Sequence, residues 1–261
     1  MLIEKIELVF LWFMIYSVIG WLYETILCSV RERHFVYRGF LFGPYCPIYG
    51  WGALLILLFL GKIQHVVPLF FAGALLTCSL EYVTGWAMEA MFHAKWWDYS
   101  HMRFHIHGRV CLLGAVAFGS FAVLHVKYLH PFVSSCTALI PPAALHAITA
   151  LLFILYLVDN IVTFRGFGGF DKKLRTLSEE LKKQKGKVAD SASLAMAGFF
   201  KSLNRHERRM IRAFPKFRPL RYNDAFSALR RWFLKKKTKN VTAADAIASE
   251  GEALTAEEKG A

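Results

Sequence analysis

Long apolar runs dominate the first part of this 261-residue chain and restrict what it can fold into. A helix needs about 20 mostly apolar residues to cross a membrane, because the hydrocarbon core is roughly 30 Å thick. Runs that approach or exceed this length cover residues 7–30, 47–60, 67–92, 110–126 and 142–164. The sequence therefore predicts an all-α integral membrane protein with about five transmembrane helices.

Charge divides the chain into parts with different expected environments. Residues 1–164 hold nine Lys and Arg against eight Asp and Glu, whereas the remainder holds 23 against 11, a net charge of +12. We expect a polytopic membrane domain over residues 1–168 and a basic, amphipathic-helical tail over residues 169–239. Residues 240–261 are rich in small and acidic residues, which predicts a disordered end.

The loops between the predicted spans differ in their content of Arg and Lys. The loops after the first and third spans each hold three basic residues, and the segments on the other side hold one each. Loops rich in Arg and Lys remain in the cytoplasm. With five spans, these loops share a side with the basic tail. We therefore predict a multi-pass protein of the cell membrane with its amino terminus outside and its carboxyl-terminal tail in the cytoplasm.

A segment rich in Gly and Pro, residues 38–52, joins the first two spans. It contains four glycines, two prolines and five aromatic residues, too much punctuation for a regular helix. Pro47 suits the first turn of the helix that follows. Two interpretations remain open, an interfacial turn anchored by aromatic residues or a re-entrant segment that lines a pocket. The concentration of special residues favours the second, whose peptide groups would need protein or water partners.

Four carboxylates fall inside the predicted spans, namely Glu24, Glu81, Glu89 and Asp159. Each costs on the order of 2.5–3.5 kcal/mol at mid-membrane on insertion scales. In the predicted topology all four lie in the inner half of the bilayer. They either form a substrate or ion site near the cytoplasmic face, or they hydrogen-bond neighbouring helices and hold the bundle together.

The loop after the third span adds polar and aromatic side chains at the same level. We predict a water-reachable vestibule that Glu24, Glu81 and Glu89 share, with residues 43–50 as its roof and Asp98 and Arg109 at its rim. Glu89 and His93 lie one helical turn apart, which makes them weak candidates for a metal site. The full set of candidates for the substrate or ion site is Glu24, Arg38, Tyr45, Tyr49, Glu81, Glu89, Trp97, Asp98, Tyr99 and Arg109.

The basic tail contains amphipathic patterns. Leu174, Leu177 and Leu181 recur at helical spacing among Lys and Glu. Further on, a second apolar face is backed by Arg and Lys, which is typical of a helix on an anionic leaflet. We therefore expect the tail to bind anionic lipid, and we expect no nucleic-acid partner because a membrane surface explains the same mixture. That second face comprises Phe226, Leu229, Trp232 and Phe233.

Several motifs resemble those of a bacterial membrane family, in the same order over roughly residues 10–165. They include Gly-Pro-Tyr-Cys-Pro-Ile-Tyr-Gly at residues 43–50, Trp-Trp-Asp-Tyr-Ser at 96–100 and Gly-Arg-Val-Cys-Leu at 108–112. The family is catalogued as putative ABC-transporter type IV, or ABC transporter permeases. The resemblance implies a transport component that couples to an ATP-binding subunit in trans. The chain has Phe-His-Ile-His-Gly at residues 104–108 where the family has Phe-Asn-Ile-x-Gly.

Three classes of function are compatible with these features. The favoured one is a permease-like transport component with an acidic site near the cytoplasmic face. The alternatives are a membrane scaffolding protein without transport and, less favoured, a membrane-embedded enzyme that acts on lipid headgroups. The sequence contains no P-loop, no nucleophile elbow and no His-Glu-x-x-His motif. We therefore assign no catalytic residues and no cofactor, and an enzyme is the less favoured expectation.

Overall fold

The computed structural model describes residues 2–167, 169–183, 189–214, 217–229 and 231. These residues form two compact units. The membrane unit combines Met1–Gly169 with Asn204–Leu220, and the tail unit combines Phe170–Leu203 with Arg221–Ala261. The sequence predicted that the membrane domain ends at residue 168 and that all of 169–239 is tail. The structure instead groups a returning piece of that tail with the membrane unit.

Four helical segments of the described residues are long and apolar enough to cross a membrane. They are α1 (Leu2–Glu32), α3 (Val66–Phe92), the continuous helix Leu112–Ala138, and α6 (Pro142–Phe167). The remaining predicted span is α2 (Pro47–Leu60), which has 14 residues. At 1.5 Å per residue α2 is about 21 Å long, which is shorter than a hydrocarbon core. The chain is thus helical and multi-pass, with four full-length candidate spans and one shorter apolar helix.

The helix Leu112–Ala138 is longer than the predicted span over residues 110–126. It consists of α4 (Leu112–Leu124), a π-helical turn (His125–Leu129) and α5 (His130–Ala138). Pro131 lies in the first turn of α5, directly after the π-helical turn. A proline lacks an N–H donor, and a π-helical turn is one way in which a helix accommodates such an irregularity. The chain therefore continues through Pro131 as a helix and breaks only before Pro142.

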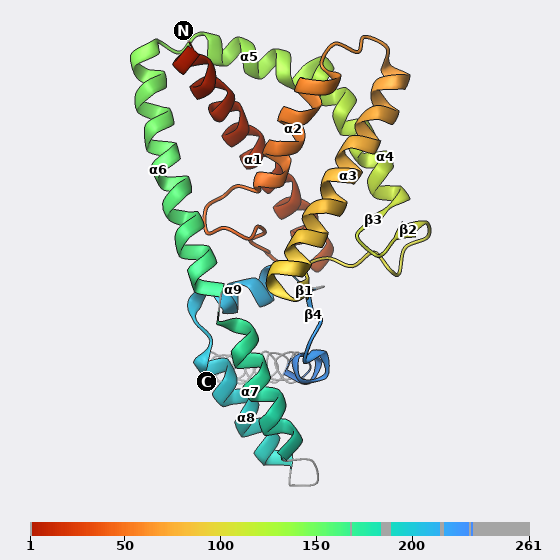
Figure 1. The fold of residues 1–261 in the computed structure, drawn as a ribbon, viewed down its shortest axis with the longest axis vertical. Coiled ribbons are helices and arrows are strands. Elements are labelled where there is room, and N and C mark those ends of the chain that lie inside the picture. Colours follow the sequence, from red (N-terminus) through yellow and green to blue (C-terminus); the bar gives the residue numbers. More distant parts are fainter. Residues whose placement is uncertain (1, 168, 184–188, 215–216, 230, 232–261) are drawn as a thin grey trace, which may run out of the picture. The chain divides into compact units, whose positions relative to one another are not determined.

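Figure 1 shows that α1, α3 and α6 run in one direction through the membrane unit, while α2 and α4 run in the other. The amino terminus and α5 lie at one end. The opposite end carries three short strands, β1 (Ala94–Lys95), β2 (His105–Ile106) and β3 (Val110–Cys111), and we call it the strand end. β2 and β3 pair as an antiparallel hairpin within the loop that joins α3 to α4.

Residues 33–46 fold back from the strand end into the bundle, so α2 begins between other helices rather than at the bundle surface (Figure 1). The backbone N–H of Cys46 donates to the carbonyl of Ser17, in the middle of α1, at 2.9 Å. Pro47 occupies the first turn of α2, as the sequence predicted. The Gly- and Pro-rich segment thus enters the bundle and positions the start of a short helix there.

Small residues let α2 approach α1 closely. A Cβ atom placed on Gly50 would lie 2.3 Å from Ser17 Oγ and 2.6 Å from Phe13. Conversely, a Cβ on Gly20 of α1 would lie 2.2 Å from the Tyr49 ring. Such contacts bring helix backbones together where bulkier residues would separate them. The side chain of Tyr49 therefore crosses α1 at Gly20.

The returning segment Asn204–Leu220 contains α9 (Arg205–Ala213) and β4 (Arg218–Pro219). Asn204 caps α9 in a reciprocal capping box with Glu207. β4 pairs antiparallel with β1, and Leu220 N donates to His93 O at 2.7 Å. Together with aromatic contacts between Trp96 and the rings of Phe214 and Phe217, this pairing explains why the segment belongs to the membrane unit.

The tail unit contains α7 (Phe170–Lys183) and α8 (Ala189–Ser202), which pack against each other. Leu174 and Leu177 of α7 are each 1% exposed, as expected for the apolar face of an amphipathic helix. Phe226 and Leu229 are each 2% exposed. The other two residues of the predicted lipid-binding face, Trp232 and Phe233, lie outside the described residues, as does the end over 240–261. Binding of anionic lipid by the tail therefore stays a prediction.

The contact between α1 and α2 gives a direct test of this packing. We expect Gly50→Ala to destabilise the protein by about 1–3 kcal/mol, because the added methyl group overpacks a site already in contact with Ser17 and Phe13. The matched control is Gly52→Ala in the same helix, where a Cβ would meet only Leu80, at 3.5 Å. Thermal unfolding in detergent measures both variants. Equal unfolding midpoints for the two variants would contradict the close approach.

Candidate functional site

A cavity of about 290 Å³ lies between α1, α2, α3 and α4 of the membrane unit. This volume is near the lower limit of sites that bind small molecules. Its wall combines apolar and aromatic side chains with two carboxylates, Glu24 and Glu81, and one guanidinium, Arg38. The two carboxylates come from the halves of α1 and α3 that are nearer the strand end. The guanidinium comes from residues 33–46, which we call the re-entrant segment.

The first carboxylate, Glu24 of α1, has a cation and a hydroxyl as partners. Arg38 Nε lies 3.4 Å from Glu24 Oε2, and the Tyr49 hydroxyl donates to Glu24 Oε1 at 3.1 Å. Arg38 is brought here by the re-entrant segment, where the indole N–H of Trp21 donates to its carbonyl at 2.8 Å. Within the cavity, the charge of Glu24 is therefore balanced by Arg38.

The second carboxylate, Glu81 of α3, is only 7% exposed. Its Oε1 accepts a hydrogen bond from the Tyr99 hydroxyl at 3.1 Å, and its Oε2 is buried without a hydrogen-bond partner among the described residues. Burial raises the pKa of Tyr99 well above its usual range, and the neighbouring Glu81 carboxylate raises it further. The Tyr99 hydroxyl therefore keeps its proton and acts as a donor. Glu81 lines the cavity, and its Oε2 lacks a hydrogen-bond donor among the described residues.

The loop over residues 97–108 holds Tyr99 against the cavity. The backbone N–H of Tyr99 donates to Gly108 O at 2.8 Å. Asp98 Oδ1 accepts from the backbone N–H of Ser100 at 2.9 Å and also from its hydroxyl. Burial acts to raise the pKa of Asp98, but the two hydrogen bonds from Ser100, together with the charges of Lys95 and Arg218, lower it below its usual value. Asp98 thus stabilises the turn rather than lining the cavity.

Gly108 completes this loop. Its φ of +70° lies in the left-handed region, and a Cβ there would lie 2.5 Å from Asp98 Oδ1 and 2.6 Å from Ser100 Oγ. Both the conformation and the close approach require a residue without a side chain. Gly108 therefore lets the two sides of the loop meet and keeps Tyr99 at its position beside Glu81.

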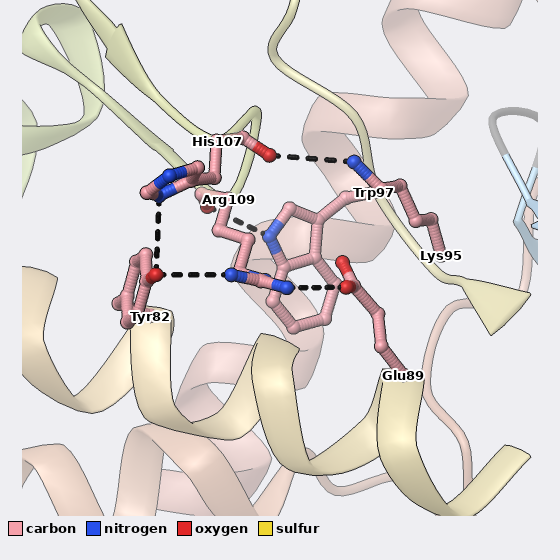
Figure 2. Close-up of polar contacts among 6 residues, drawn as sticks. All are labelled: Tyr82, Glu89, Lys95, Trp97, His107 and Arg109. Carbon is pink, nitrogen blue, oxygen red and sulfur yellow. Dashed lines mark hydrogen bonds and ion pairs between the residues drawn. The ribbon is translucent and has the colours of Figure 1, made fainter. Parts of the chain in front are cut away.

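Arg109 organises a second polar cluster next to the cavity, shown in Figure 2. Its Nη2 lies 2.6 Å from Glu89 Oε2 and its Nη1 donates to the Tyr82 hydroxyl at 3.0 Å. The indole N–H of Trp97 donates to the Arg109 carbonyl at 2.9 Å. Trp97 also lines the cavity. The ion pair with Glu89 thus fixes Arg109, and Arg109 in turn fixes one aromatic wall of the cavity.

A third cluster joins the re-entrant segment to α6. Asp159 Oδ2 accepts from the Tyr45 hydroxyl at 2.5 Å and from Gly43 N at 2.7 Å, and Oδ1 accepts from Phe42 N at 2.9 Å. Asp159 therefore satisfies backbone donors of irregular chain inside the bundle. This is a structural role, and Asp159 does not line the cavity.

The structure brings together some of the predicted site residues and separates others. The cavity gathers six of the ten candidates, namely Glu24, Arg38, Tyr49, Glu81, Trp97 and Tyr99. The other four lie in neighbouring clusters. Glu89 and Arg109 pair with each other, Asp98 shapes the loop, and Tyr45 bonds Asp159. The predicted vestibule of three acids therefore contains two of them, Glu24 and Glu81.

The weak metal candidates do not converge. Glu89 bonds Arg109, and His93 ends α3 in a left-handed conformation with φ of 50°. Among the described residues, no group of three or more His, Cys, Asp or Glu is placed to hold a metal ion. We therefore build no metal site on this pair.

Sequence reasoning missed the apolar wall of the cavity. Ile56, Phe118, Phe121 and Leu124 line it, together with His125 at the start of the π-helical turn. Helical spacing on the face of Glu24 could have found the residues of α1, since Tyr16, Gly20 and Tyr23 share it. No comparable signal marked α4, because its residues are apolar on all sides.

Comparison with known proteins places these features in a family. A family model described as "Putative ABC-transporter type IV" matches residues 11–164, which include every residue that lines the cavity. The chain belongs to this family. Its membership in the ABC-transporter type IV family and its four apolar helices agree in indicating a multi-pass membrane protein. No curated protein and no solved structure matches the chain.

The ion pair between Glu89 and Arg109 yields a prediction. The two side chains are 11% and 16% exposed, so removal of one partner leaves a poorly solvated charge. We expect Arg109→Gln to destabilise the protein by on the order of 3 kcal/mol. The double variant Glu89→Gln, Arg109→Gln should lose less than the sum of the single losses, which thermal unfolding in detergent measures.

The control for this cycle is Arg103→Gln, because Arg103 lies exposed in the same loop. Its effect should stay within about 0.5 kcal/mol, as for surface substitutions generally. Strictly additive losses for Glu89 and Arg109 would mean that the two side chains do not interact.

Proposed function

We propose that this chain is a permease-like transport component whose substrate site is the cavity between α1, α2, α3 and α4. The observation that carries the proposal is a cavity of about 290 Å³, lined by a buried carboxylate with an unpartnered oxygen, inside the region that matches the family model. An ionisable group buried in a membrane bundle is costly, and such groups are usual on substrate and ion pathways.

The acidic part of the cavity is proposed to face the cytoplasm. At the strand end lie Arg31 in the last turn of α1, Lys95 in β1, and the loops with Arg33 and Arg103. Near the other end, Lys62 lies in the loop after α2 and Lys127 lies in the π-helical turn. Cytoplasmic loops have an excess of Arg and Lys. This asymmetry supports an amino terminus outside and a cytoplasmic strand end. Labelling of a cysteine at Ser100 by an outside-only reagent would contradict that orientation.

The partner implied by the family is an ATP-binding subunit in trans. The 261 residues contain no P-loop motif. In this proposal the ATP-binding subunit is a second chain, and that chain hydrolyses ATP. The basic loops and the returning segment at the strand end are the surfaces that such a subunit would reach. Lipid contact follows from the apolar helices themselves.

The test combines transport and partner binding in cells that lack the protein. Wild-type protein should restore the cellular level of a small molecule that the deletion changes, and it should co-purify with an ATP-binding subunit that hydrolyses ATP. Ala53→Trp fills the cavity, because Ala53 lines it. We expect this variant to insert and to retain the subunit, but to lose the restored phenotype.

The matched control is Leu75→Trp, which adds the same ring to a side chain of α3 that is 72% exposed. This control should behave as the wild type. Full restoration by Ala53→Trp, with no ATP-binding subunit bound to either protein, would overturn the proposed transport function.

A further inference from the structure

The charges that line the cavity do not cancel. Glu24 is paired with Arg38, at 3.4 Å. For Glu81, no ion pair with a described Lys, Arg or His is formed. Arg109, which the sequence predicted at the rim of the vestibule, is bonded to Glu89 outside the cavity. An ionised Glu81 therefore leaves the cavity with one unbalanced negative charge.

The hydroxyl groups around Glu81 cannot supply the missing donor. Tyr99 already donates to Glu81 Oε1, and Tyr49 donates to Glu24. The Thr77 hydroxyl donates to the Gly73 carbonyl of its own helix at 2.7 Å. Because these donors are committed, Glu81 Oε2 remains buried and unpartnered. A buried acceptor of this kind is stabilised by a hydrogen-bond donor, and a molecule bound in the cavity can supply that donor.

The charged residues that line the cavity lie at one end of it. On α1 its lining runs from Glu24 back to Tyr16, eight residues or about 12 Å along the helix axis. At the Tyr16 end the lining includes Ile56 and Leu124 together with His125, whose ring centroid lies 4.6 Å from that of Tyr16. This lining fits a molecule with a polar group near Glu81 and an apolar body directed away from the strand end.

We infer that the cavity binds a protonated amine attached to an apolar body, with the ammonium N–H donating to Glu81 Oε2. This inference rests on the proposed function, since it names the substrate class of the same site. The ammonium balances the unpaired carboxylate, and the rings of Trp97, Tyr49 and Tyr99 provide electron-rich faces for a cation. The apolar body packs between α2 and α4.

A divalent metal ion is a poorer occupant than an amine. Ca²⁺ takes six to eight oxygen ligands and Mg²⁺ demands an octahedral set. The hydroxyls next to Glu81 are those of Tyr99 and Tyr49. Both already donate to carboxylates, Tyr99 to Glu81 and Tyr49 to Glu24. One ammonium group satisfies both the charge and the missing hydrogen bond.

The test is calorimetric binding to the full chain in phosphatidylcholine nanodiscs at pH 7. The probes are 2-phenylethylamine, its neutral analogue 2-phenylethanol and the quaternary phenyltrimethylammonium ion. We expect the amine to bind more tightly than both others, because only the amine has a positive charge and an N–H donor. Equal affinity for the amine and the alcohol, or for the amine and the quaternary ion, would overturn the inference.

Variants tie the binding to the site. Glu81→Gln keeps the size of the side chain and removes its charge, and it should weaken amine binding by about tenfold or more. The control Glu7→Gln makes the same change on α1, where Glu7 contacts His146 outside the cavity. Glu7→Gln should bind as the wild type. Unchanged amine affinity in a folded Glu81→Gln protein would overturn the inference.

Two sources could supply such an amine, a free small molecule or the headgroup of an amine-bearing lipid. Binding is therefore repeated in nanodiscs that contain phosphatidylethanolamine. Weaker apparent binding of 2-phenylethylamine there assigns the site to the lipid, and unchanged binding assigns it to a free amine. Either result retains the amine chemistry.

Failure of this inference is separable from failure of the proposed function. If the alcohol binds as well as the amine and Ala53→Trp blocks both, the cavity is a substrate site of different chemistry. If no probe binds and Ala53→Trp restores the transport phenotype fully, the proposed function itself fails.

Discussion

The rest of the membrane unit depends on the hydrogen bonds that the Asp159 carboxylate on α6 accepts. This carboxylate accepts hydrogen bonds from Phe42 N, Gly43 N and the Tyr45 hydroxyl. Irregular backbone inside a bundle must have its polar groups satisfied by protein or water. Asp159 accepts hydrogen bonds from backbone N–H groups at the point where the chain re-enters the bundle. The Ser17 carbonyl accepts one from Cys46 N. Without these acceptors α2 would not begin between α1 and α3, and the cavity would lose one wall.

Arg38 connects the cavity with the segment that returns from the tail. Besides its contact with Glu24, its Nη1 donates to Ala213 O at 2.6 Å, and its guanidinium lies 4.4 Å from the centroid of the Phe214 ring. Arg209 in α9 donates to Phe40 O at 2.8 Å. The returning segment thus binds the re-entrant segment at Arg38 and at Phe40. A change in the docking of α9 would therefore reach Glu24 through a single side chain.

Much of this architecture was predictable from the sequence because apolar length and charge are local properties. The apolar runs predicted the helices, and the cost of burying charge singled out Glu24 and Glu81, which both line the cavity. The pairing of Glu89 with Arg109 was not predictable, because it depends on how the loop over residues 93–111 folds back on α3. Glu89 lies eight residues after Glu81 on the same helical face, so periodicity alone could not tell which of these two acids faces the cavity.

The grouping of residues 204–220 with the membrane unit has no local sequence signal either. Their Arg-rich composition is typical of the basic tail. In the structure, however, β4 pairs with β1, and Phe214 and Phe217 contact Trp96. Such long-range contacts leave no local pattern in the sequence. The same holds for the apolar wall on α4. The residues of that wall differ from lipid-facing neighbours only in their contacts, and those contacts depend on how α4 packs against α3.

The central claim is that Glu81 gives a water-reachable cavity a negative charge. Its most direct test is thiol modification of Thr77→Cys, a position that lines the cavity, in a protein whose five native cysteines have been replaced. The account predicts that a cationic methanethiosulfonate reagent modifies this cysteine faster than an anionic one, and that Glu81→Gln removes the difference. The lipid-facing control Val83→Cys, at a side chain 56% exposed, should react slowly with both. Equal rates for the two reagents at Thr77→Cys, or no reaction with either, would contradict the account.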